Sequence, residues 1–144
     1  MLEDSLSLER TLAIIKPDAV SRNLQGEILS RIHKAGFRIV AIKTMILTNG
    51  EAAGFYVVHK GRPFFGELTD FMSSGKILVL VLEAEGAILK WRESMGATDP
   101  QKAAPGTIRR DLGTSIGNNC THGSDAPDTA AFEISYFFAG LELI

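Results

Sequence analysis

The sequence predicts an α+β fold in which helices pack on a four-stranded antiparallel sheet. Short apolar runs rich in β-forming residues alternate with segments of helical periodicity along the chain. Glycine and proline fall between these elements, and no repeat, low-complexity tract or linker interrupts them. The 144 residues suit one compact domain. We therefore expect a single domain over residues 9–144, preceded by a flexible extension over residues 1–8.

The first two predicted strands flank a helix. RTLAIIK, residues 10–16, is an apolar run that ends before Pro17, as is typical of a buried strand. GEILSRIHKAG, residues 26–36, has apolar residues at helical spacing and a glycine at its end. FRIVAIKTMIL, residues 37–47, alternates loosely over the length of a long strand.

The middle of the chain predicts a pair of helices followed by a central strand. Thr48 and Glu51 have the spacing of a capping box, which predicts a helix through residues 51–60. A second short helix is expected within residues 63–72, which begin with proline. ILVLVL, residues 77–82, is continuously apolar, as expected of a strand that is covered on both faces.

The last third contains a helix, a long irregular segment and a final strand. Residues 87–96 have helical character, whereas residues 97–120 are rich in glycine, proline and short polar residues. Ordered loops of this length are uncommon unless they serve a function. Ser124 or Asp125 is expected to cap a short helix, and EISYFF, residues 133–138, predicts a strand, with a continuing helix as the open alternative.

These elements follow the order β-α-β, a helical pair, β-α, a loop with a helix, and β. That order is typical of a ferredoxin-like split βαβ sandwich.

Composition and charge exclude several classes of protein. The single cysteine, Cys120, forms no intramolecular disulfide, which favours a reducing, cytoplasmic setting. No apolar run approaches the roughly 20 residues that span a bilayer, and the acidic N-terminus is unlike a secretory signal. The net charge of −2 gives no reason to expect a membrane or nucleic-acid partner.

Five segments, in order, resemble the nucleoside diphosphate kinase family: ERTLAIIKPDAV, HKGRPFFGEL, KWRESMGATDP, APGTIRRD and NNCTHGSD. The resemblance extends from Glu9 to Phe138. It implies magnesium-dependent transfer of the terminal phosphate of a nucleoside triphosphate, such as ATP or GTP, to a nucleoside diphosphate. It also implies a phosphohistidine intermediate, ping-pong kinetics and a homo-oligomer, either tetramer or hexamer, for which residues 37–47 are a plausible exposed edge.

His122 is the candidate nucleophile. It lies between an irregular loop and a predicted helix start, where backbone N–H groups can face an anion. Gly123 leaves room for close approach, and Ser124 adds a hydroxyl donor. A neutral imidazole attacks through one nitrogen if the other is held as N–H, and the resemblance assigns that holding role to Glu133. Oxidation or alkylation of Cys120, two residues away, is expected to obstruct the site.

The remaining site residues are assigned by the resemblance. The chain has no GxxxxGK[ST] loop, so side chains must supply the charge around the moving phosphoryl group. Mg²⁺ is expected to arrive on the nucleotide phosphates rather than in a protein cage. Tyr56 is expected to place a phenolic hydroxyl near His122 and Lys16. The expected contacts to phosphate and sugar are Lys16, Arg92, Thr98, Arg109 and Asn119, and those to the base are Phe64, Leu68 and Ile116.

Several of these residues also have an ordinary structural explanation. Lys16 could be a simple strand-end lysine, Tyr56 a half-buried tyrosine, Phe64 a core residue and Glu133 a solvated glutamate. His33 and His59 are expected to be ordinary surface or core histidines. An RNA-binding module of the same topology lacks its basic face and aromatic pattern here. A metal hydrolase built on His122, Asp125 and Asp128 lacks further ligands, and a regulatory binding domain has no need of a nucleophile ringed by cations.

Overall fold

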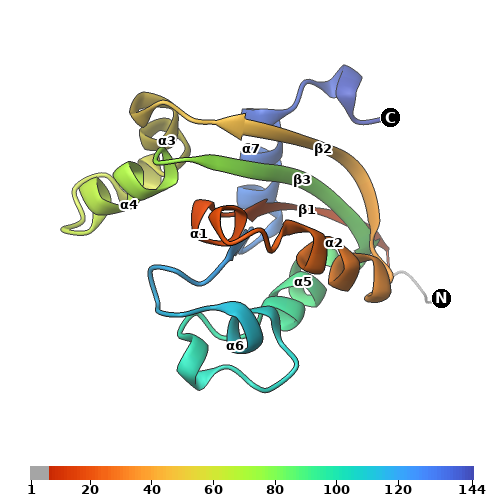
Figure 1. Cartoon of the computed structure of the whole chain (residues 1–144). Coiled ribbons are helices and arrows are strands. Elements are labelled where there is room, and N and C mark those ends of the chain that lie inside the picture. Colours follow the sequence, from red (N-terminus) through yellow and green to blue (C-terminus); the bar gives the residue numbers. More distant parts are fainter. Residues whose placement is uncertain (1–6) are drawn as a thin grey trace.

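The computed structural model describes residues 7–144 (Figure 1). The extension expected over residues 1–8 falls largely outside this part of the chain and stays a prediction. The main elements are β1 (Leu8–Ile15), α1 (Pro17–Ser21), α2 (Gln25–Lys34), β2 (Arg38–Ile46), α3 (Asn49–Phe55), α4 (Phe65–Met72), β3 (Lys76–Glu85), α5 (Ala87–Met95), α6 (Ile108–Leu112), β4 (Thr121–Gly123) and α7 (Pro127–Phe137).

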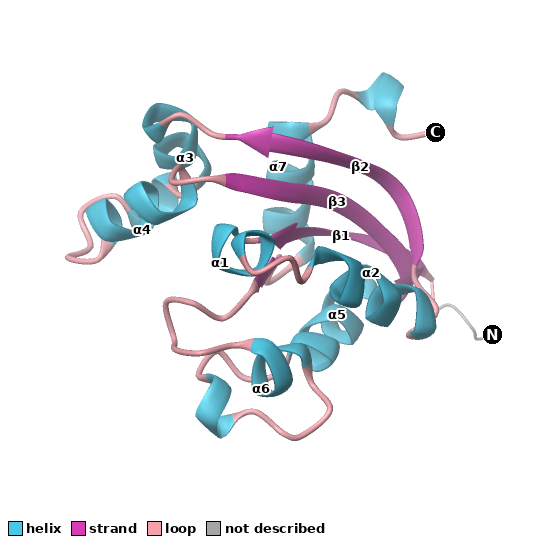
Figure 2. Cartoon of the chain, in the orientation of Figure 1, coloured by secondary structure: helices cyan, strands magenta, loops and turns pink. Residues whose placement is uncertain are grey.

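The four strands form one antiparallel sheet in the order β2-β3-β1-β4 (Figure 2). This confirms the predicted fold class and leaves β2 at one edge of the sheet, as expected for residues 37–47. The fourth strand, β4, lies at the opposite edge and pairs with β1 over three residues. The central position of β3 explains its continuous apolar run, because both of its faces are covered.

Two hydrophobic clusters lie on the two faces of the sheet. One joins alternate residues of β1 and β3 to α1, α2 and α5, with Trp91 and Ile32 among its buried members. The other joins the intervening strand residues to α3, α4 and α7, with Phe55 and Phe137 among its members. Figure 1 shows α7 behind the sheet and α2 in front of it. Side chains alternate along a strand, so one apolar strand supplies both layers.

The predicted strand at residues 133–138 is wrong, because residues 133–137 belong to α7. Their aromatic side chains follow helical geometry: Phe137 is buried, while Phe132 and Tyr136 are exposed. The fourth strand is instead β4, inside a segment that the sequence presents as loop and helix start. A strand of three residues is too short to produce a periodic pattern.

The capping expectations have mixed outcomes. Thr48 and Glu51 form the predicted capping box, with N–H to oxygen distances of 3.1 and 2.8 Å, but α3 ends at Phe55 rather than continuing to residue 60. Neither Ser124 nor Asp125 caps α7. The N-cap position is Ala126, and the Thr129 hydroxyl accepts the backbone N–H of Ala126 at 2.9 Å.

The longest helix in the described part of the chain, α7, has 11 residues. No helix within residues 7–144 has the length and apolarity needed to cross a bilayer.

Candidate active site

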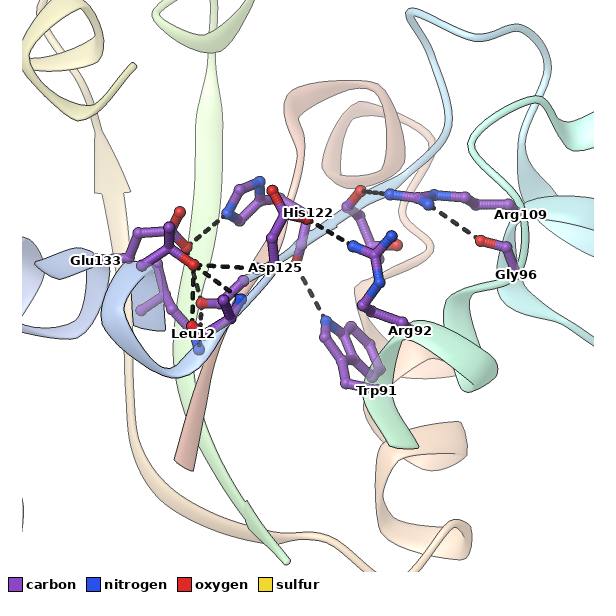
Figure 3. A network of polar contacts seen from close by, with 12 residues as sticks. Leu12, Trp91, Arg92, Gly96, Arg109, His122, Asp125 and Glu133 are labelled. Carbon is purple, nitrogen blue, oxygen red and sulfur yellow. Dashed lines mark hydrogen bonds and ion pairs between the residues drawn. The ribbon is translucent and has the colours of Figure 1, made fainter. Parts of the chain in front are cut away.

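His122 is the middle residue of β4 and pairs with Ile14 of β1. Its ring lies against the edges of Phe55 and Tyr56, with centroid separations of 5.3 and 6.1 Å. Its Nε2 atom is 2.9 Å from Oε1 of Glu133, which belongs to α7 (Figure 3). Glu133 therefore occupies Nε2 and not the other ring nitrogen, Nδ1.

A chain of hydrogen bonds holds Glu133 in this position. The Ser124 hydroxyl donates to the same carboxylate oxygen at 2.8 Å, and the Leu12 backbone N–H donates to Ser124 at 3.2 Å. Ser124 is completely buried, and the His122 and Glu133 side chains are only 18% and 14% exposed. A carboxylate fixed by two donors keeps Nε2 protonated and the imidazole in one orientation. Ser124 is therefore directed at Glu133.

Lys16 approaches the site from the end of β1. Its backbone N–H donates to the Cys120 carbonyl at 2.8 Å, which ties Lys16 to the segment that leads into β4. Its ammonium donates to Asn119 Oδ1 at 2.8 Å, and the Asn119 amide donates to the Thr98 carbonyl at 3.0 Å. Burial, with a smaller contribution from the charge of Arg109, lowers the pKa of Lys16 to about 8.

Arg109 and Arg92 bring two further positive charges. Arg109 donates to the carbonyls of Gly96 at 3.1 Å and Thr121 at 2.8 Å. Burial, followed by the charge of Arg92, lowers the pKa of Arg109 to about 10, so it stays charged at neutral pH. Arg92 pairs with Asp125 at 2.7 Å, and these side chains are 49% and 77% exposed. Figure 3 shows both arginines on the same side of β4 as Trp91.

Tyr56 follows α3 and is buried beside the imidazole. Burial, with the Glu133 charge as the second cause, raises the pKa of Tyr56. Its hydroxyl is consequently a neutral hydrogen-bond donor over the whole physiological pH range.

The expected base contacts divide into exposed and packed residues. Phe64 precedes α4 and is 44% exposed, and Ile116 lies in the loop before β4 and is 59% exposed. Leu68 is half-buried and packs against the core cluster of α3, α4 and α7. His59, expected to be an ordinary histidine, lies between the rings of Tyr56 and Phe64, with centroid distances of 6.3 and 5.4 Å.

Three contacts of the site carry no signal in the sequence. The Trp91 indole donates to the His122 carbonyl at 3.1 Å, Arg92 pairs with Asp125, and the Cys120 N–H donates to Asp18 at 3.1 Å. Each joins residues 31 or more positions apart. Only the folded chain reveals such pairs.

The donor set of the site fits a metal that arrives with its ligand. Within residues 7–144, no group of three or more His, Cys, Asp and Glu side chains is placed to hold a metal ion. The site is instead cationic, and its exposed carboxylate, Asp125, already pairs with Arg92. Cations of this kind suit phosphate oxygens, and a divalent ion bound to those oxygens would need no cage of protein ligands.

A histidine oriented by a largely buried carboxylate, with cationic side chains nearby on a ferredoxin-like sheet, indicates an enzyme of phosphorylated substrates. A family model described as "Nucleoside diphosphate kinase" matches residues 9–143. The chain belongs to the nucleoside diphosphate kinase family, whose members are phosphotransferases of nucleotide metabolism that use a divalent metal.

Individual relatives support this assignment over nearly the whole chain. A nucleoside diphosphate kinase of Syntrophotalea carbinolica is 60% identical over 137 residues, which are 95% of this chain and 100% of the relative. One of a Bradyrhizobium species is 62% identical over 139 residues, 96% of this chain and 99% of the relative.

Two solved structures agree. The nucleoside diphosphate kinase of Aquifex aeolicus superposes with a TM-score of 0.93 at 47% identity, covering 96% of this chain and 100% of that one. That of Halobacterium salinarum, solved in complex with CDP, gives a TM-score of 0.91 at 41% identity, with coverage of 96% and 92%.

Proposed function

We propose that Nδ1 of His122 is the atom that carries the phosphoryl group in the nucleoside diphosphate kinase reaction of this chain. The observation that carries the proposal is the bond between Nε2 and Glu133 at 2.9 Å, because it leaves Nδ1 as the free nucleophile. Ser124 donates to the same carboxylate oxygen and so fixes the direction of the pair. Glu133 and Ser124 therefore orient the nucleophile.

The reaction divides into two half-reactions of the same kind. In the first, the Nδ1 lone pair attacks the terminal phosphorus of a nucleoside triphosphate, the bond to the bridging oxygen breaks, and the diphosphate leaves. In the second, the terminal oxygen of another diphosphate attacks the same phosphorus, and the bond to Nδ1 breaks. The Nε2 proton stays on the imidazole throughout, and the positive charge that develops on the ring faces Glu133. Ping-pong kinetics follow.

Cationic side chains stabilise the charge on the transferring group. Lys16, Arg92 and Arg109 are assigned to the phosphate oxygens, and arginine can contact two oxygens at once. Tyr56 donates its neutral hydroxyl beside the imidazole. Phosphoryl transfer depends mainly on such positioning and electrostatic stabilisation.

The nucleoside occupies the more open side of the site. Asn119, already bonded to Lys16, and Thr98 are assigned to the sugar and nearby phosphate oxygens. Phe64 offers an exposed ring for stacking on the base, and Leu68 and Ile116 form the apolar border of the slot. Stacking tolerates every base, so purine and pyrimidine nucleotides, ATP and GTP included, are all substrates.

Mg²⁺ is proposed as the divalent ion, bound through the nucleotide phosphates. When bound, it neutralises phosphate charge and holds the terminal phosphate in a reactive conformation.

A homo-oligomer is proposed to form through the β2 edge. Ile42 and Ile46, four residues apart on one face of this strand, are 45% and 63% exposed. An unpaired strand edge with apolar residues favours pairing with another copy of the chain. The assembly is a tetramer or a hexamer.

We place the enzyme in the cytoplasm, acting on free nucleotides without a membrane or nucleic-acid partner. The single cysteine and the net charge of −2 support this assignment.

The nucleophile is tested by labelling the purified chain with γ-labelled ATP and magnesium. We expect acid-labile, base-stable label on the wild-type protein and stoichiometric release of ADP before any acceptor is added. His122→Ala is expected to abolish both without unfolding, whereas His33→Ala, at an exposed histidine of α2, is the matched control and keeps them. Label on the His122→Ala chain would contradict the proposal.

A further inference from the structure

The strand that carries His122 has little sheet structure of its own. It has three residues, lies at the edge of the sheet, and pairs with β1 through Ala13, Ile14 and Ile15. A short edge strand is among the less protected parts of a fold. The reacting nitrogen nevertheless has to be held within a fraction of an ångström of its productive position.

Side chains from outside the sheet supply additional support to β4. Arg109 donates to the Thr121 carbonyl at 2.8 Å, and the Trp91 indole N–H donates to the His122 carbonyl at 3.1 Å (Figure 3). The Trp91 bond ends on the same residue that carries the imidazole. Trp91 is completely buried, so this donor is shielded from competition by water.

The packing around the indole is as close as the backbone allows. A Cβ atom added at Gly123 would lie 2.5 Å from Cδ1 of Trp91 and 2.7 Å from Cε of Met95, both in α5. Only a glycine permits this approach. Side chains alternate along a strand, so Gly123 faces α5 while the His122 ring faces Phe55 and Tyr56 on the other side. The indole therefore supports the backbone from the face opposite the imidazole.

The indole lies inside the hydrophobic core on this face of the sheet. The ring of Phe37 meets it edge to face with a centroid distance of 6.0 Å, and both residues belong to the core cluster of α1, α2 and α5. Motion of the nucleophile toward α5 is blocked by packing, and motion away from α5 breaks the bond to Nε1.

We propose that Trp91 is a positioning residue for phosphoryl transfer, which holds the His122 backbone so that Nδ1 meets the terminal phosphate in line. This inference rests on the proposed role of His122 as nucleophile. Trp91 touches neither the substrate nor the reacting atoms. Its contribution lies in the rate of transfer rather than in nucleotide affinity, since affinity depends on Phe64, Asn119 and the cationic side chains.

The test removes the indole N–H while preserving its shape. Trp91 is the only tryptophan of the chain, so it can be replaced cleanly with β-(3-benzothienyl)alanine, in which sulfur replaces the N–H group. Trp91→Phe is a second variant that also removes the indole N–H. Phe37→Leu is the matched control, because it disturbs the same cluster but leaves the Trp91 donor in place.

Single-turnover phosphorylation by ATP and magnesium and the Kd of a non-transferable ATP analogue are measured for each protein, with thermal stability alongside. We expect both Trp91 variants to be phosphorylated about tenfold more slowly with the Kd unchanged within about twofold, and Phe37→Leu to keep its rate despite lower stability. The Trp91 indole N–H resonance of the wild-type enzyme should also shift when His122 is phosphorylated.

A wild-type rate in the benzothienyl enzyme overturns the inference, as does an equal slowing in Phe37→Leu, which would mean that the core merely needs to be well packed. Label on His122→Ala has a separate meaning: it refutes the nucleophile itself and this inference with it. Loss of label in His122→Ala together with a wild-type rate in the Trp91 variants refutes the positioning role alone.

Discussion

The two sides of the candidate site are built differently. On the side of His122, largely buried groups of three elements, β1, β4 and α7, are joined by hydrogen bonds through Ser124 and Glu133. On the base side, Phe64 and Ile116 present exposed apolar surface, 44% and 59% exposed. The contrast suits a reaction in which the chemistry is the same for every substrate and the base varies. The side chains are held precisely where bonds break, whereas the surface that meets the nucleoside accepts different bases.

The largest expected effect concerns the His122 side of the site. Glu133→Gln keeps the shape of the side chain but removes the charge that faces Nε2 of His122. We expect phosphorylation by ATP to slow about 100-fold with nucleotide affinity nearly unchanged. Rapid-quench labelling measures the rate. Asp128→Asn, an exposed acid on the same helix, is the control, and equal slowing there would contradict the assignment.

On the open side, Phe64→Ala is expected to raise the KM of nucleoside diphosphates about tenfold, because one stacking surface is lost. The effect should be similar for purine and pyrimidine substrates and should leave kcat nearly unchanged. Steady-state kinetics with four diphosphates measure it. Phe132→Ala removes a ring that is equally exposed, at 44%, but lies on α7, and it should change nothing. A defect in kcat alone would show that Phe64 acts on the chemistry.

A pH profile tests the charge of Lys16. Burial lowers the pKa of Lys16 to about 8, so its charge is present below this pH and is lost as the pH rises through it. We expect the KM of ATP to rise from pH 8 upward, by about tenfold at pH 9, and proton uptake to accompany binding near pH 8. Lys16→Arg should make KM flat over this range, with Lys76→Arg as an exposed control. A flat wild-type profile over this range would contradict the lowered pKa of Lys16.

The smallest expected effect concerns the ion pair at the rim. Arg92 cannot contact phosphate fully while it pairs with Asp125. Asp125→Asn removes this competitor, and we expect binding of nucleotide without metal to tighten about two- to threefold at low salt, since exposed ion pairs are weak. Titration at low and high salt measures the change, which salt should suppress. Weaker binding in Asp125→Asn would contradict a purely competing role.

The structure bears on the hypothesis that modification of Cys120 obstructs the site. Cys120 is completely buried, accepts a hydrogen bond from Arg22, and has a pKa raised by burial. A protonated, buried thiol reacts slowly with oxidants and alkylating agents. Proximity to His122 in the sequence says nothing about access, so obstruction of the site by thiol modification stays a prediction without structural support.

The sequence by itself determined the sheet class, three of the four strands, the capping box at Thr48 and Glu51, and the family through its five segments. Those features depend on residues that are close together in the sequence. A periodic pattern, a cap or a short motif each extends over about ten residues. Residues 133–138 show the limit of local signals, because aromatic and β-branched side chains suit a strand as well as one face of a packed helix.

Only the tertiary structure decided how the site is held together. The strand β4 exists because β1 offers it a partner, and Glu133, Trp91 and Arg109 reach it from α7, α5 and α6. None of these contacts follows from spacing along the chain, and only the contact of Glu133 with His122 was expected, from the family resemblance. They arise because burying the two faces of one sheet brings distant helices to the same edge, where packing and desolvation select which polar groups meet.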